Sequence, residues 1–291
     1  MGNRRVVEQL GNWLEALGFS VRITPLANPD KANLIATYGR GDGGLVLAGH
    51  TDTVPYDDSR WQSDPFALTE RDQRFYGLGT ADMKGFFALV IEAVSNLLDQ
   101  PFNAPLIILA TADEESSMDG ARALVQADVL GARYAIVGEP TGLRTVGAHK
   151  GCYEYRTTIT GLDGHSSEPA RAVSAVHHAS RWISGLMGLA DELATRAPDP
   201  SPYSPPSTTF NVGTIDGGQG RCVVANRCTF DWEMRPVQRA DSDFVKARIA
   251  EVEAGLLAEM RAVHPTASIQ TEVVCEVDGL EFDDASPALG L

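Results

Sequence analysis

Three short apolar segments in the first half of the chain run directly into histidine or acidic residues. Short apolar runs between turn residues are typical of buried β-strands. Helical patterns lie between them, over residues 83–98 and 120–127, so the order predicts an α/β fold, an open, mostly parallel sheet with helices on both faces. The polar residues would then meet at the carboxyl edge, where open α/β sheets bind ligands. The segments and the side chains that follow are residues 45–48 with His50 and Asp52, 106–110 with Glu114 and Glu115, and 134–137 with Glu139.

Further elements are expected before residue 50. Apolar residues recur with helical spacing over residues 4–17, and Gly18 is expected to end that helix. Residues 33–38 and 45–48 are expected to be neighbouring strands, joined by the glycine-rich turn of residues 39–44.

The pattern changes near Gly151. Strand-like segments of alternating polarity now surround two amphipathic helices, in the order β-α-β-β-α-β. This order predicts a separate α+β domain, in which helices cover one face of a sheet. The expected elements are residues 153–160, 172–189, 210–215, 228–234, 242–263 and 268–274.

Composition narrows the class of protein. The 291 residues are 43% hydrophobic, enough for packed cores, and carry a net charge of −15. We therefore expect no nucleic-acid partner, because such a partner needs a basic surface. No apolar run approaches the length of a membrane span and the first residues lack an apolar signal core, so we expect a cytoplasmic protein with no membrane partner. The cysteines form no Cys-x-x-Cys pair, which indicates reduced thiols; they are Cys152, Cys222, Cys228 and Cys275.

His50 and Asp52 suit a metal ligand and its orienting partner. A histidine can bind a metal through one ring nitrogen and donate its other N–H to a carboxylate. A lone His-x-Asp is more often a satisfied polar pair, by roughly three to one. The acids at two further strand ends favour a metal site, and one imidazole among carboxylates suits zinc, cobalt or manganese. Carboxylates can also bridge two ions, and Asp82, in the loop before a helix, is the expected bridge.

The adjacent acids Glu114 and Glu115 predict a division of roles. Neighbouring side chains of an extended segment point in opposite directions, so one can bind metal while the other stays near the reacting water. A free carboxylate there can take the proton of the water and pass it to a leaving amine. Taken alone, the two glutamates are better interpreted as part of a solvated acidic turn. Together with the polar residues at the other two strand ends, a functional role for them is favoured by roughly four to one.

Five motifs resemble those of the M20 family of di-zinc amidohydrolases and peptidases, and among them the members that deacetylate N-acetyl amino acids. They occur in the family's order, and the resemblance covers nearly the whole chain. It implies a catalytic domain over residues 1–150, an inserted dimerisation or lid domain over 151–264, and an incomplete return to the catalytic domain over 265–291. The motifs are GHTDTVP (49–55), YGLGTADMKG (76–85), TADEESS (111–117), VGEPT (137–141) and GHSSEPARAV (164–173).

The resemblance also implies roles for single residues, with two divalent metal ions as cofactors, zinc first and cobalt as a possibility. In a homodimer, His165 would reach the neighbouring subunit's site and stabilise the oxyanion, and Arg235 would hold the substrate carboxylate. Without the resemblance, a Gly-His-Ser-Ser loop is more often plain surface, and a strand-end arginine is more often paired with a local acid. At the metal centre, His50 and Glu139 would bind one zinc, Asp82 would bridge, Glu115 would bind the second zinc, Glu114 would be the general base and acid, and Asp52 would orient His50.

Comparison with the family pattern gives one local difference and two further expectations. Where members often have an asparagine before the arginine, this chain has Cys222, with Asn226 nearby. A late histidine that binds the second zinc belongs to a segment that would follow Leu291, so we expect the second metal site to lack one ligand in this chain. The peptide bond after the bridging aspartate is often cis in the family, which makes Asp82–Met83 a candidate.

The expected function is metal-dependent hydrolysis of a small N-acyl amino acid. N-acetyl-L-ornithine is the first expectation, giving L-ornithine and acetate in arginine biosynthesis. N-acetylcitrulline or succinyl-diaminopimelate is the alternative substrate on the same machinery. A second alternative, from another class, is a metal-poor, inactive subunit or fragment that acts only through its dimerisation surface.

Overall fold

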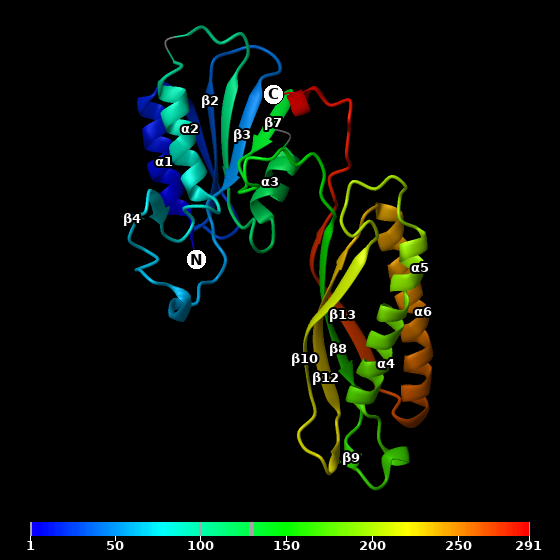
Figure 1. Cartoon of the computed structure of the whole chain (residues 1–291). Helices are drawn as coiled ribbons and strands as arrows, with labels where there is room; N and C mark the ends of the chain where they lie inside the picture. Colours follow the sequence, from blue (N-terminus) through cyan, green and yellow to red (C-terminus); the bar gives the residue numbers. More distant parts are fainter. Residues whose placement is uncertain (1, 99, 128–130, 291) are drawn as a thin grey trace. The chain divides into compact units, whose positions relative to one another are not determined.

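The computed structural model describes residues 2–98, 100–127 and 131–290 (Figure 1). The chain divides into two compact units, one formed by the residues up to Thr145 with Gly290, the other over Val146–Leu289. Each unit has its own hydrophobic core. Within the described ranges, no helix combines the length and the apolar character that crossing a membrane requires.

The first unit contains a five-stranded mixed sheet. Its elements are α1 (Arg4–Ala16), β1 (Ser20–Pro25), β2 (Ala32–Tyr38), β3 (Leu45–His50), β4 (Thr69–Arg71), β5 (Arg74–Tyr76), α2 (Lys84–Ser95), β6 (Leu106–Thr111), α3 (Asp119–Ala127) and β7 (Tyr134–Val137). The strand order is β1-β2-β6-β3-β7, and β4 and β5 pair only with each other. β3 is parallel to β6 and β7, whereas β2 is antiparallel to β1 and β6.

Helices cover both faces of this sheet. Successive strand residues point to opposite faces, so the apolar residues of the strands are buried by helices on both sides. On one face, α1 and α2 pack through Leu14 and Val90 against Leu34 and Ile108. On the other face, α3 packs through Leu124 in a core whose strand members are Ile35, Val46, Ile107 and Leu109. The predicted open α/β fold with helices on both faces is therefore confirmed, with β6, β3 and β7 as its parallel part.

The start of the chain contains one predicted and one unpredicted feature. α1 is followed by Gly18 at φ 90°, and the Phe19 N–H donates to the Leu14 carbonyl at 3.0 Å, which is a Schellman end. Gly18 thus ends the helix as expected. β1, in contrast, is absent from the sequence prediction, because this edge strand is largely exposed.

The expectation that β2 and β3 are neighbours is wrong. β6 lies between them, antiparallel to β2 and parallel to β3. The physical reason is the composition of β6, whose first five residues are buried. When a strand is apolar along its whole length, a position in the centre of the sheet removes more of its apolar surface from water than a position at the edge does.

The second unit is an α+β layer structure. Its elements are β8 (Cys152–Thr160), β9 (Gly164–His165), α4 (Ala175–Gly188), α5 (Ala190–Thr195), β10 (Thr209–Gly217), β11 (Val223–Val224), β12 (Arg227–Arg235), α6 (Arg239–Val263) and β13 (Ser268–Val277). The main sheet has the order β10-β12-β8-β13 with antiparallel neighbours. α4 and α6 lie side by side on one face of it (Figure 1), where Trp182 and Ile249 join Phe230 and Tyr155 in one core.

The expected return to the first domain over residues 265–291 is wrong. β13 pairs along its length with β8, and residues up to Leu289 belong to the second unit. The cause is backbone hydrogen bonding. β8 pairs with β12 along one edge and with β13 along the other, so its backbone groups are satisfied on both sides. The division of the chain lies at Thr145–Val146, a few residues before the expected boundary.

Candidate metal centre

The carboxyl ends of the three parallel strands lie level with one another. In their register His50 is beside Thr111, and Ala48 is beside Val137. The residues that follow each strand therefore emerge at one edge of the sheet. This is the edge at which the sequence pattern places His50 and the acids.

His50 is the centre of this arrangement and is only 1% exposed. Its Nε2 lies 2.9 Å from Asp82 Oδ1, 3.7 Å from Glu139 Oε1 and 3.9 Å from Glu114 Oε2. These carboxylates come from the loop before α2, from the residues after β7 and from the turn after β6. One buried imidazole nitrogen thus faces carboxylates from separate parts of the unit.

Asp52 connects the histidine with the turn after β6. Its Oδ1 lies 3.4 Å from His50 Nδ1, the one buried side-chain nitrogen or oxygen in the described part of the chain without a hydrogen bond. The Asp52 carboxylate also accepts the backbone N–H groups of Glu114 at 3.3 Å and Glu115 at 3.1 Å. One carboxylate therefore orients both the histidine ring and the two adjacent glutamates.

The charges of the cluster shift its pKa values. Burial lowers the pKa of His50, but the adjacent carboxylate of Asp52, together with Glu114 and Asp82, outweighs burial and raises this pKa to about 9. Burial raises the pKa of Glu114, Glu115 and Glu139, and the charge of Asp82 adds to each shift while His50 opposes it. Burial raises the pKa of Asp52, yet the adjacent His50 ring and the hydrogen bond from the Glu115 N–H outweigh burial and lower this pKa.

Lys84 is a member of this neighbourhood that the sequence analysis does not identify. It is half-buried at the start of α2, and its Nζ lies against Gly79, where a Cβ would come within 2.2 Å. Burial lowers the pKa of Lys84, and the charges of Asp52 and Asp82 oppose this effect. Its place in the YGLGTADMKG motif is the only sequence signal, because a lysine at a helix start is ordinarily solvated.

The residues present fit divalent metal ions. Two groups of possible ligands lie within 4.8 Å, one of His50, Asp82 and Glu115, the other of His50, Glu114 and Glu139. An imidazole nitrogen among carboxylate oxygens is a donor set for zinc, cobalt or manganese. The grouping differs from the expected division, in which Glu139 joins Asp82 at one ion, so the assignment of ligands to ions stays a prediction.

Two local expectations are corrected by the backbone. Among the described residues the cis peptide bonds precede Pro200 and Pro205, so the Asp82–Met83 bond is trans, the form favoured by about 3–4 kcal/mol outside proline. Glu114 and Glu115 lie in a turn rather than in an extended segment, because Asp113 has a φ of 60°. Their N–H groups then converge on Asp52.

His165 and Arg235 belong to the second unit. His165 is exposed on β9, with its Nδ1 2.7 Å from the Ser167 hydroxyl. Arg235 ends β12, where Nε donates to Glu233 Oε2 at 2.9 Å, the local acid pairing that such an arginine usually makes. Cys222 is exposed and precedes β11, which pairs with β9. The roles of His165 and Arg235 stay predictions.

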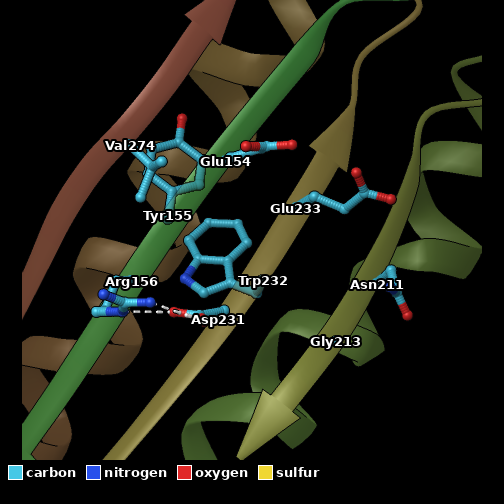
Figure 2. A pocket seen from close by; sticks show the side chains of 9 residues that line it. All are labelled: Glu154, Tyr155, Arg156, Asn211, Gly213, Asp231, Trp232, Glu233 and Val274. Atoms are coloured by element: carbon cyan, nitrogen blue, oxygen red, sulfur yellow. Dashed lines mark hydrogen bonds and ion pairs between the residues drawn. The ribbon is translucent and has the colours of Figure 1, made fainter. Parts of the chain in front are cut away.

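Figure 2 shows a pocket of about 300 Å³ on the sheet of the second unit. Its lining comes from β8, β10, β12 and β13. Arg156 spans it from β8 to Asp231 on β12, with hydrogen bonds of 2.7 and 3.0 Å. Glu233, the ion-pair partner of Arg235, also lines it.

Curated proteins are similar to this chain over most of its length. Acetylornithine deacetylase of Pasteurella multocida is 48% identical over 236 residues, which are 81% of this chain and 62% of that protein. Acetylornithine deacetylase of Proteus mirabilis is 46% identical over 236 residues, 81% of this chain and 61% of that protein. The chain thus spans about three fifths of the length of these relatives.

Solved structures share the fold at lower identity. A tripeptidase from Staphylococcus aureus is 21% identical with a TM-score of 0.74, and the match covers 99% of this chain and 74% of that one. A Bacillus subtilis protein described as a dinuclear metal binding peptidase from the M20 family is 15% identical with a TM-score of 0.62, covering 97% and 70%. The model of peptidase family M20/M25/M40 matches residues 46–273, which include His50, the acids around it and parts of both units. This chain therefore belongs to peptidase family M20/M25/M40.

Proposed function

We propose that this chain is part of a metal-dependent deacetylase that hydrolyses N-acetyl-L-ornithine to L-ornithine and acetate. The observation that carries the proposal is the convergence of Asp82, Glu114 and Glu139 on the buried Nε2 of His50. The 48% identity to an acetylornithine deacetylase supports the choice of substrate over N-acetylcitrulline and succinyl-diaminopimelate.

The ligands would be the residues that surround His50. His50, Asp82, Glu115 and Glu139 would hold two divalent ions, zinc first and cobalt as the alternative. When bound, such ions lower the pKa of water and polarise the amide carbonyl. Lys84, half-buried beside Asp82, would offset part of the negative charge that remains.

Glu114 would move the proton in the reaction. Its carboxylate lies 3.9 Å from His50 Nε2 and is partly exposed, so that it borders the place where the amide reacts. It would accept a proton from the attacking water and donate it to the leaving amine. Burial raises the pKa of Glu114, which brings the carboxyl group nearer to the neutral range in which both transfers are needed.

The second unit would contribute to substrate binding. Arg235 would hold the α-carboxylate of the substrate, with Glu233 fixing the guanidinium until the substrate arrives. His165 has one ring nitrogen engaged with Ser167, which leaves Nε2 as the nitrogen available to an oxyanion. We propose that His165 acts in the site of a second copy in a homodimer.

The substrate proposal is tested by amine release. The chain, supplied with zinc or cobalt, is assayed with N-acetyl-L-ornithine, N-acetyl-L-citrulline and N-succinyl-diaminopimelate at equal concentrations. We expect the highest kcat/KM with N-acetyl-L-ornithine. A preference for either of the others would overturn the substrate, and a metal-loaded chain that hydrolyses none would favour a non-catalytic role.

Glu114→Gln tests the assignment of the proton-transferring group. The amide keeps the size of the side chain but cannot take a proton, so kcat should fall by about 10²–10⁴-fold. Asp113→Asn is a poor control because of its own contacts, whereas Glu251→Gln, which changes an exposed acid of α6 in the second unit, should leave kcat unchanged. Metal content, measured on the same samples, should stay at the wild-type value. An equal loss of metal and activity would place Glu114 among the ligands instead.

A further inference from the structure

The turn that carries Glu114 and Glu115 begins with an unusual backbone conformation. Asp113 has a φ of 60°, in the left-handed region that L residues other than Asn and Asp seldom adopt. This conformation is strained for most L residues. It turns the chain so that the N–H groups of Glu114 and Glu115 both donate to Asp52. The direction of the two glutamates therefore depends on Asp113.

The side chain of Asp113 is held by a lysine that lies far away in sequence. Asp113 is 5% exposed, and its Oδ1 accepts a hydrogen bond of 2.6 Å from Lys31 Nζ. Lys31 directly precedes β2, and its side chain is 24% exposed. An ion pair that is this short and this protected from water is stronger than an ordinary surface pair.

The backbone on either side of the turn is hydrogen-bonded to Asn33, a neighbour of Lys31 in the sequence. Asn33, on β2, accepts the Ala112 N–H at 3.2 Å and donates to the Gly120 carbonyl at 2.8 Å. The Asp113 carbonyl accepts the Met118 N–H at 2.7 Å, which closes the turn. Lys31 is thus the charged member of a set of contacts, made by residues at the start of β2, that holds the turn.

We propose that Lys31 and Asp113 form a positioning pair that holds the turn in the conformation needed by Glu114 and Glu115. This proposal rests on the proposed function for the roles of the two glutamates. Neither Lys31 nor Asp113 faces His50 Nε2 or belongs to a ligand group. They act through the backbone. The ion pair stabilises the left-handed conformation of Asp113, and this conformation sets the direction of the Glu114 and Glu115 carboxylates.

Hydrogen exchange in the metal-free chain tests the pair without using activity. In Lys31→Met, the amides of Glu114 and Glu115 should exchange at least about tenfold faster, while those of β6 keep their wild-type rates. Lys31→Arg keeps the charge and should retain most of the protection. Arg181→Met removes an exposed ion pair to Glu259 in the second unit and is the matched control, with no change expected in the turn.

A second substitution separates the ion pair from the backbone. Asn adopts the left-handed conformation as readily as Asp, so Asp113→Asn removes the charge without new strain. It should match Lys31→Met, and the double variant should be no worse than either single one, because the two side chains act as one unit. Additive effects, or wild-type exchange of the two amides in both single variants, would overturn the proposal.

Kinetics and metal spectroscopy connect the pair with the site. In Lys31→Met we expect kcat to fall by at least about tenfold with KM unchanged, because small misplacements of reacting groups are costly. The absorption spectrum of the cobalt-loaded chain should also change, since Glu115 is a proposed ligand. A purely structural pair would lower the melting temperature and leave both readouts at wild-type values. A wild-type chain that binds no cobalt and hydrolyses no amide would overturn the proposed function, whereas the exchange rates would still decide the positioning pair.

Discussion

His50 owes its properties to opposing influences on one side chain. Burial disfavours the charged ring, but carboxylates face both ring nitrogens, and their combined effect raises the pKa of His50 from 6.5 to about 9. At pH 7 the metal-free ring is therefore protonated and paired with acids. A metal ion that binds through Nε2 has to replace that proton.

Metal binding at pH 7 should therefore release a proton from His50. Below pH 9 the affinity for zinc should fall by about tenfold for each unit by which the pH decreases. Calorimetric titrations in two buffers of different ionisation enthalpy would measure the release, and equal heats in both buffers would contradict it.

The same shift predicts the pH dependence of the metal-free fold. Because the folded-state pKa of His50 lies above the ordinary 6.5, the protonated ring contributes stability that is fully present below pH 6.5. That stability is lost as the pH rises through about 9. The melting temperature of the metal-free chain should decrease over this interval, and bound zinc should reduce the decrease.

At the scale of elements, the close contact between α2 and the loop before it places Asp82. Gly85 lies in the first turn of α2, and its N–H donates to the Gly79 carbonyl at 3.1 Å. A Cβ at Gly85 would lie 2.1 Å from the Thr80 carbonyl oxygen. The loop from Gly79 to Asp82 can therefore take this path only because position 85 has no side chain.

Gly85→Ala should move this loop and weaken metal binding. We expect a loss of about 1–3 kcal/mol in the free energy of unfolding, because backbone has to shift to admit the methyl group. Gly188→Ala is the matched control, since no atom lies within 4 Å of its Cβ and Ala is favoured in a helix by about 0.5–1 kcal/mol. Denaturant titration and zinc affinity measure both effects. Unchanged zinc affinity in Gly85→Ala would show that the loop can adapt.

At the scale of the whole molecule, the two units have separate cores. The core of the second unit contains residues from β8, β12, α4 and α6, including Trp182, Phe230 and Val245. The proposed ligands all lie in the first unit. The folding of the second unit and the binding of metal should therefore be separable.

Residues 146–289 should fold when they are expressed alone. Their core includes stacked Tyr155 and Trp232, with ring centroids 4.3 Å apart, so near-ultraviolet circular dichroism reports its packing. Zinc should raise the melting temperature of the full chain but not that of the isolated unit, because only the former holds the ligands. A zinc-dependent shift in the isolated unit would contradict the location of the site, and loss of the aromatic signal would contradict its independence.

The sequence by itself determined the α/β class, the end of α1 at Gly18, the α+β character of the second half and the convergence of acids on His50. These features follow from local patterns, since strand and helix periodicity and the residues at strand ends are written in short segments. Only the tertiary structure decided that β6 separates β2 from β3, that β13 belongs with β8, and that Lys31 and Lys84 lie beside the acidic turn and Asp82. Such contacts join residues far apart in the chain, and a left-handed Asp113 has no local signature of its own. Their placement depends on which strands pair and which side chains are buried together, and that is settled only when the whole unit packs.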